Sequence, residues 1–217
     1  MLRQRTARPI PARVDDAALE ADLQRYRQLA LDCGASGVEV VPASWVTVDE
    51  RVRLKCQVPL CHQFGRCSNC PPHLPELDIV RKALGRFKRA VLLKRDVVPV
   101  EDFADSTRVG KEGRAHTLKV DEIVGRIEAT AFVDGYYLAM GFGSGSCRVS
   151  WCDSLMCQML DSGMCRFAMK ARPSMEAMGI DVFGLATRAG WEVYPVYKGM
   201  DAASVPCALC VGIVFVS

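Results

Sequence analysis

The sequence predicts an α/β or α+β fold, in which a mixed sheet with flanking helices carries irregular cysteine-rich loops. Half of the 217 residues are hydrophobic and 24% are charged, a composition that supports a folded core. Stretches with helical periodicity alternate with short runs rich in β-branched residues. Two segments without either period carry eight of the eleven cysteines. These three observations together favour one core with cysteine-bearing insertions.

The elements follow from hydrophobic spacing. Apolar residues recur at three- and four-residue steps from Leu19 through Tyr26 to Ala30, and Gly34 follows, so residues 17–33 should form a helix. The same reasoning predicts helices at 76–84, 120–132, 174–178 and 182–189. Strands are expected at 38–41, 45–48, 90–93, 136–140, 191–197 and 211–216. Residues 99–113 show no clear period and are expected to form a loop.

Residues 1–14 are expected to form a flexible basic arm, and residues 15–217 a single metal-binding domain with cysteine-rich segments 56–72 and 145–166. The arm carries the residues Arg3, Arg5, Arg8, Arg13, Pro9 and Pro11. Such a segment is typical of a solvated tail. The net charge of +3 is too small to indicate a nucleic-acid or membrane surface.

The chain is expected to be cytoplasmic. No apolar stretch follows the basic start, and the longest apolar run, 207–216, is about half as long as a membrane helix. Thiols stay reduced in the cytosol, so a cysteine-rich chain there binds metal more often than it forms disulfides. An odd count of eleven cysteines would also leave one thiol outside any closed set of disulfides.

The first cysteine group is a compact set of four thiols followed by Pro71 and Pro72. It has the spacing Cys56-x4-Cys61-x5-Cys67-x2-Cys70. Four thiolates within so short a segment can surround one metal centre without help from a distant part of the chain. A proline after the last cysteine keeps the chain extended as it leaves the site, as in bacterial ferredoxin motifs.

The second cysteine group follows a glycine-rich turn. It has the spacing Cys147-x4-Cys152-x4-Cys157-x7-Cys165. Residues five apart point about 140° away from each other on a helix and to opposite faces of a strand, so only an irregular loop brings these thiols together. Gly141, Gly143, Gly145 and Gly163 favour such a loop.

The remaining candidates have less distinctive settings. Cys33 is expected to be a core residue, whereas Cys207-x2-Cys210 is equally compatible with core packing and with a role as extra ligand or redox thiol. The three histidines are expected to be hydrogen-bond donors or surface residues: His62, His73 and His116. Arg166 is a candidate for offsetting the charge of bound thiolates, and Arg172 and Glu176 for supporting a centre or capping a helix.

Iron–sulfur clusters suit these spacings better than zinc. Structural zinc usually takes paired cysteines two to four residues apart, and in the two groups only Cys67 and Cys70 have that spacing. We therefore expect [4Fe–4S] clusters, with zinc as the alternative.

At these residues the sequence resembles the DUF2284 family of predicted metal-binding proteins, from the first cysteine group to the last strand. The resemblance lies in the Cys-Pro-Pro of 70–72, the Gly145-x-Cys147 step, Cys165-Arg166 and the run ARPSMEAMGIDV at 171–182. It implies binding of a metal or cluster and implies no particular reaction. Cys67, Cys207 and Cys210 and the wide spacing of the second group depart from the family pattern.

The sequence thus favours an iron–sulfur protein with two clusters that acts in electron transfer or as a redox adaptor, in a process sensitive to oxygen and with a protein redox partner. One alternative is a reductase in which a cluster binds substrate, if Cys67 is not a ligand. Another is a zinc-stabilised interaction module. No catalytic residue is assigned, and neither a phosphate-binding loop nor a dinucleotide fingerprint is present.

Overall fold

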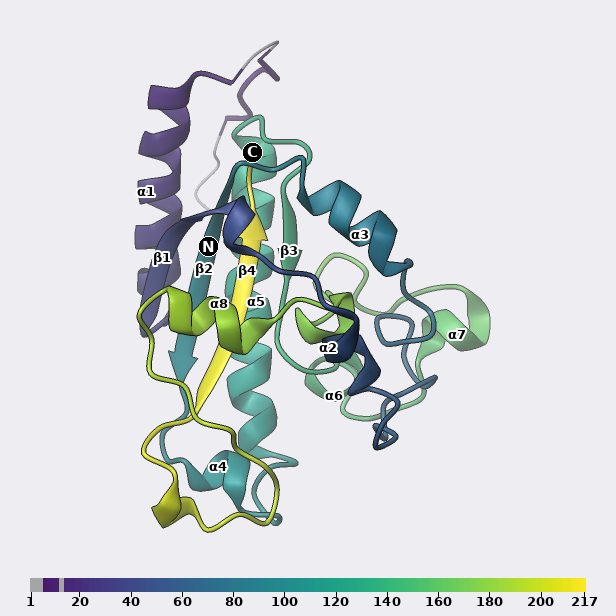
Figure 1. Ribbon diagram of the computed structural model, residues 1–217. Helices are drawn as coiled ribbons and strands as arrows, with labels where there is room; N and C mark the ends of the chain where they lie inside the picture. Colours follow the sequence, from purple (N-terminus) through teal and green to yellow (C-terminus); the bar gives the residue numbers. More distant parts are fainter. Residues whose placement is uncertain (1–5, 12–13) are drawn as a thin grey trace.

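A four-stranded sheet forms the centre of the computed structural model, which describes residues 6–11 and 14–217 (Figure 1). The strands β1 (Gly37–Pro42), β2 (Arg89–Asp96), β4 (Leu209–Phe215) and β3 (Met140–Phe142) lie side by side in this order. Every neighbouring pair is antiparallel, with Leu92 opposite Ile213 and Phe142 opposite Ile213 in the register.

The α+β prediction is confirmed, but the sheet is antiparallel throughout, where a mixed sheet was expected. The β2 and β3 strands run in the same direction, and α5 (Glu112–Val133) lies between them in the chain. They are not neighbours, because β4 inserts between them in the opposite direction. Alternation of helices and strands in the sequence cannot reveal such an insertion.

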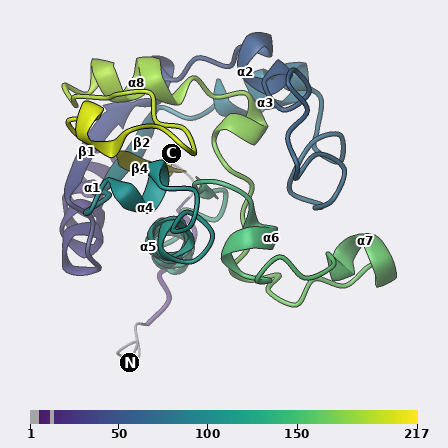
Figure 2. The same cartoon turned by 90° about the horizontal axis from the view of Figure 1, so that it is seen from below.

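Two helices cover one face of the sheet. These are α1 (Asp16–Asp32) and α5 (Figure 2). Leu23 and Tyr26 of α1 and Val124 of α5 are completely buried against strand residues such as Val91. Burial of one such side chain stabilises the fold by about 1.5–3 kcal/mol. The helix α1 starts where the Asp15 side chain accepts a hydrogen bond from the Ala18 amide at 2.8 Å.

The other face is covered by α3 (Leu77–Leu84), α8 (Val182–Arg188) and the short helices η1 (Ala43–Trp45) and η2 (Glu176–Met178). Met175 and Ile180 flank η2 and are completely buried against Phe215 of β4. The central strands β2 and β4 are therefore covered on both faces, which explains their nearly continuous apolar sequences.

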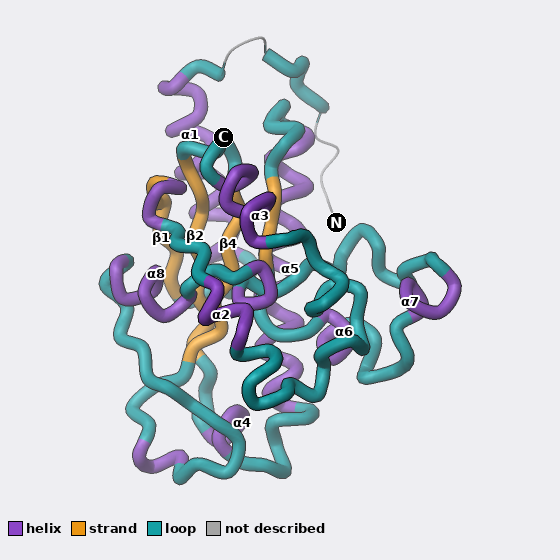
Figure 3. Tube along the Cα trace, turned by 45° about the vertical axis from the view of Figure 1, so that its right-hand side comes forward, coloured by secondary structure: helices purple, strands orange, loops and turns teal. Residues whose placement is uncertain are grey.

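The cysteine-rich segments lie beside this core, beyond the β3 edge (Figure 3). The first is the loop that follows α2 (Glu50–Leu54), and the second contains α6 (Cys147–Ser150) and α7 (Gln158–Ser162). The remaining short helices are α4 (Glu101–Ala104) and η3 (Ala202–Ser204). No helix among the described residues is long and apolar enough to span a membrane.

Part of the predicted arm lies outside the described residues, namely 1–5 and 12–13. The described part contacts the core: Arg8 donates two hydrogen bonds of 2.8 Å to Asp22, and its amide donates to the Val133 carbonyl. Asp22 and Asp134 are buried and share the guanidinium of Arg25. This ionic cluster joins the arm, α1 and the end of α5.

The predicted helices correspond to α1, α3, α5, η2 and α8, and three predicted strands correspond to β1, β2 and β4. The strand predicted at 136–140 is wrong except at Met140, because β3 begins there and continues through Gly141 to Phe142. The strand predicted at 45–48 is wrong, because Trp45 belongs to η1 and Val48 forms only an isolated bridge with Ile180. The strand predicted at 191–197 is also wrong. Pro195 lacks an amide donor, and the segment has no ladder partner among the described residues. The loop predicted at 99–113 contains α4 and the start of α5.

Candidate metal centre

Turns fold the first cysteine segment back on itself. The amide of Cys61 donates to the carbonyl of Cys56 at 3.0 Å, and the amide of Cys70 donates to that of Cys67 at 3.0 Å. The Gly65 amide closes the loop by donating to the Pro71 carbonyl at 2.8 Å. Four cysteines that are spread along the sequence are thus brought into one short folded loop.

The glycine-rich turn that leads into α6 also helps to position the thiols. A Cβ atom on Gly143 would lie only 1.9 Å from Asp121 Oδ1 on α5, so no larger residue fits without a shift of this contact. The Ser144 amide donates to the same oxygen at 3.1 Å. Asp121 Oδ2 is buried with no hydrogen-bond partner among the described residues, and burial raises the pKa of this carboxyl to about 7. The turn is therefore fixed directly onto α5.

The two segments meet at a cluster of buried thiols. Cys67 Sγ lies 3.3 Å from Cys147 Sγ, although the two residues are 80 positions apart. Asn69 Nδ2 donates to Cys147 Sγ at 3.4 Å, and Cys70 Sγ donates to Ser146 Oγ at 3.4 Å. Hydrogen bonds from the Cys147 and Cys70 thiols lower the pKa of Cys67. The hydrogen bond between Cys147 and Cys67 raises the pKa of Cys147 above that of a free thiol.

Three cysteines of the first segment line a pocket of about 620 Å³, here called the cysteine pocket: Cys56, Cys61 and Cys70. Burial raises the pKa of Cys56, with a smaller contribution from Cys61. Cys67 does not belong to the pocket lining. We call the thiols of both segments that meet here the inner cysteines: Cys56, Cys61, Cys67, Cys70 and Cys147.

The other three cysteines of the second group, Cys152, Cys157 and Cys165, are named the outer cysteines. Cys157 Sγ lies 3.8 Å from Ser68 Oγ, which links this set to the first segment. Burial raises the pKa of Cys152, and a hydrogen bond from Arg166 acts in the opposite direction. Arg166 thus lies where its charge offsets that of a thiolate, as the sequence suggested.

The chain around the outer cysteines exposes many large apolar side chains. Met169 is 85% exposed and Met164 66% exposed. We call the full set the apolar lobe: Leu155, Met156, Met159, Leu160, Met164 and Met169. In Figures 1 and 2 this part of the chain, with α6 and α7, extends away from the sheet. Exposed apolar patches of this kind often mark surfaces that bind partners.

The run at 171–182 returns the chain from the lobe to the core. Arg172 forms hydrogen bonds of 2.8 and 3.2 Å with Glu128 of α5. The Pro173 carbonyl accepts from the Gly143 amide, and Ser174 Oγ caps η2 by accepting from Ala177 at 3.1 Å. Arg172 and Ser174 therefore have structural roles. Glu176, like Ser174, lines the cysteine pocket, and burial raises the pKa of Glu176.

The remaining cysteines belong to neither set. Cys210 is buried in the core on β4, where burial raises its pKa to about 12. Cys207 Sγ donates to the Glu192 carbonyl at 3.5 Å, and Cys33 packs against the core at the end of α1. In the described part of the chain, these three residues neither belong to the cluster of buried thiols nor line the cysteine pocket.

The histidines have different settings. His116 is buried, and its Nε2 lies 2.9 Å from an oxygen of Asp102. His73 Nε2 lies 3.4 Å from the Gly65 carbonyl and is exposed, whereas His62 lines the cysteine pocket. Sequence reasoning gave no sign of Ser146 and Asn69 as thiol partners, because a serine and an asparagine in a loop carry no distinctive spacing.

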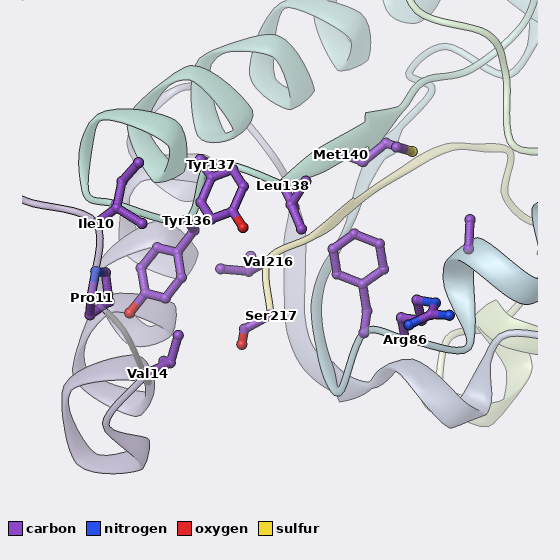
Figure 4. Close-up of a pocket in the computed structure, with 13 residues that line it drawn as sticks. Ile10, Pro11, Val14, Arg86, Tyr136, Tyr137, Leu138, Met140, Val216 and Ser217 are labelled. Carbon is purple, nitrogen blue, oxygen red and sulfur yellow. The ribbon is translucent and has the colours of Figure 1, made fainter.

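A second pocket, of about 360 Å³, lies far from the cysteines at the end of β4 (Figure 4). Its lining is mostly apolar, with Ile10 from the arm, Tyr136 and Leu138 after α5, and Val216 after β4. Arg86 is the one charged residue in the described lining. Without a thiol, histidine or carboxylate side chain, this pocket offers no metal ligands.

The thiols are close to each other but do not form a compact set for one ion. Among residues 6–11 and 14–217, no three or more histidine, cysteine, aspartate or glutamate side chains are arranged to hold a single metal ion. Residues 39–211 match the protein family described as predicted metal-binding protein (DUF2284). No curated protein and no solved structure matches the chain. Because the family match covers most of its length, the chain belongs to the DUF2284 family of predicted metal-binding proteins.

Proposed function

We propose that this metal-binding protein holds iron–sulfur clusters, most simply two of the four-iron type, and acts in electron transfer. The observation that carries the proposal is the meeting of Cys67, Cys70 and Cys147 from two distant segments. The donors fit such a group, because they are thiols, are largely buried, and include Cys147, whose sulfur accepts a hydrogen bond from Asn69. When bound, a cluster of this type supplies transfer of single electrons.

The spacing of the cysteines along the sequence supports iron–sulfur clusters over zinc. Structural zinc usually takes paired cysteines two to four residues apart, and in the two groups only Cys67 and Cys70 have that spacing. The inner cysteines and the outer cysteines are then the two ligand sets, with Cys157 next to Ser68 at their junction.

The apolar lobe supports a role in passing electrons to another protein. Its exposed methionines surround the outer cysteines and can adapt to a partner surface. The segment 147–172 carries Arg148, Arg166, Lys170 and Arg172 but only Asp153 and Asp161, so it favours an acidic partner. The protein redox partner is thus proposed to dock at the lobe.

A second candidate, a reductase with a substrate next to its cluster, is favoured by the cysteine pocket. Cys56, Cys61 and Cys70 line it, whereas Cys67 lies outside the lining and contacts Cys147. A centre held by the three pocket cysteines would have one side open to a small molecule. Cys67→Ser with unchanged iron content and unchanged electron paramagnetic resonance would favour this candidate.

The test is the metal content after anaerobic purification. Two four-iron clusters require about eight irons per chain with matching acid-labile sulfide. Cys70→Ser and Cys165→Ser should each retain about half of the iron, because each removes a ligand from one set only. Cys33→Ser, which changes a thiol outside both sets, should retain all of it. Stoichiometric zinc without sulfide would overturn the proposal and favour a structural zinc module.

A further inference from the structure

The cysteine pocket is larger than its three thiols account for. Its volume of about 620 Å³ lies within the range of small-molecule sites, about 300–1,000 Å³. Besides the first cysteine loop, its lining includes the start of α5 and the loop at 196–198. Elements from three distant parts of the chain therefore enclose one space.

Two cationic side chains, one of them already ion-paired, line the part of the pocket formed by α5 and the 196–198 loop. Lys198 is exposed and has no ion pair among the described residues. Arg114, in the first turn of α5, is held by the Ser150 carbonyl at 3.1 Å and by Asp153 at 2.7 Å. Gly110 and Gly113 also line the pocket next to the positive end of this 22-residue helix. This part of the pocket is suited to an anionic group.

The rest of the pocket lining is largely apolar and aromatic. Phe64, Phe103, Val149 and Tyr197 contribute to it, and all four are at least partly exposed. A flat apolar body placed here would cover side chains that otherwise face water.

Glu176 is the carboxyl group in the lining and lies in the wall next to Ser174. It has no cationic partner among the described residues, and Ser174 is its hydrogen-bond partner. Glu176 is half-buried, so its carboxyl can accept a hydrogen bond from a group on a bound molecule near the thiols.

We infer that the pocket binds a small organic carboxylate with a flat apolar body, which places its carboxylate toward Lys198 and Arg114 and its body between the aromatic rings and the cysteines. The inference rests on the proposed function, since it gives the pocket cysteines of the reductase candidate a ligand. It assigns the substrate class as aryl or unsaturated carboxylic acids, without assigning the bond that reacts.

Three probes of one shape test the charge requirement: trans-cinnamate, its neutral amide cinnamamide, and cinnamylamine. We would measure their affinities by calorimetry on the anaerobic protein with its metal and again after metal removal. Cinnamate should bind saturably, cinnamamide about tenfold more weakly because it loses the ionic contacts, and cinnamylamine not at all. Equal affinity for acid and amide, or no saturable binding of cinnamate, would overturn the inference.

Lys198→Gln tests the position of the carboxylate, and Lys82→Gln on α3 is the matched control. Lys198→Gln should weaken cinnamate about fivefold, the factor that corresponds to about 1 kcal/mol, while Lys82→Gln leaves affinity unchanged. Equal effects of the two variants would place the acid elsewhere. Iron and sulfide are counted on the same samples. Cinnamate binding to a protein without iron would refute the proposed function alone, and an iron-loaded protein that ignores cinnamate would refute this inference alone.

Discussion

The inner and the outer cysteines belong to the same candidate centre but are held in different ways. The inner set is fixed to the core, because Gly143 and Ser144 contact Asp121 on α5 immediately before Cys147. The outer set lies in a segment whose large apolar side chains face solvent. The difference indicates that the fold itself positions the inner thiols, whereas the outer thiols depend more on what they bind. An internal site and a site of exchange with a partner would differ in this way.

The largest expected effect comes from Asp121, the buried carboxyl that supports the inner set. Its pKa is about 7 in the folded protein and about 3.9 in the unfolded chain. Between these values the folded state holds a proton that the unfolded state has released, so stability falls as pH rises from about 4 to about 7. Above pH 7 both states are ionised and the penalty is constant.

The expected loss over this pH range is about 2–4 kcal/mol in the unfolding free energy of the metal-free protein. Asp121→Asn should remove this part of the pH dependence, since an amide does not titrate. Urea unfolding of both proteins at several pH values gives the difference directly. If unfolding free energy depends on pH in the same way for both proteins, Asp121 does not titrate in this range. The argument that Asp121 fixes the inner cysteines to the core would then be weaker.

Gly143→Ala is the next largest change. A methyl group would enter the space of the Asp121 carboxylate and push the glycine-rich turn off α5, with an expected loss of about 2–3 kcal/mol. Gly125→Ala is the control, because its added Cβ meets nothing within 4 Å and it lies within α5. That control should stabilise the protein by up to about 1 kcal/mol. If both variants unfold at the same temperature, the turn is not fixed as described.

Arg172→Gln tests the contact where the chain leaves the apolar lobe and rejoins the core. Both Arg172 and Glu128 are about four-fifths buried, and loss of their pair should cost about 1–2 kcal/mol. Arg51→Gln removes an exposed pair with Asp49 and should leave stability nearly unchanged. Thermal unfolding of the two variants separates these outcomes, and similar values would show that the lobe is not secured through Arg172.

The smallest effect is expected for Met169→Gln in the apolar lobe. Because Met169 is already in water, the change should alter stability by less than about 0.5 kcal/mol while it lowers binding of an apolar surface dye. Denaturant unfolding and dye fluorescence measure the two properties on the same sample. A loss of stability above about 1 kcal/mol would mean that the apolar lobe is packed like the core. The inner and outer cysteines would then not differ in how they are held.

The sequence predicted regular elements well where one period dominates. The spacing of Leu19, Leu23 and Tyr26 gives α1, and the apolar run near the end of the chain gives β4. It could not predict the strand order, because insertion of β4 between β2 and β3 depends on packing against both helix layers. Trp45 suggested a strand but belongs to η1, where the Arg188 guanidinium lies 4.7 Å from the centre of its ring.

The candidate site was predictable as a set of thiols but not in its grouping. Spacing assigned Cys147 to the second group, whereas folding places it against Cys67 of the first. Motif spacing describes only contacts that are local in sequence, and this contact is created by α5 and the turn at Gly143. The position of Lys198 and Arg114 in the cysteine pocket could likewise not be predicted, since nothing in the sequence relates the 196–198 loop to the first cysteine loop.

The contact between Cys67 and Cys147 also determines when, during translation, the inner cysteines can come together. The two residues are 80 positions apart, and a ribosome adds roughly 5–20 residues per second, so roughly 4–16 seconds pass between their appearance. During this interval the first four thiols exist without their fifth neighbour, exposed to any oxidant or stray metal. The inner set can therefore be completed only late in translation or after release, once α5 has formed.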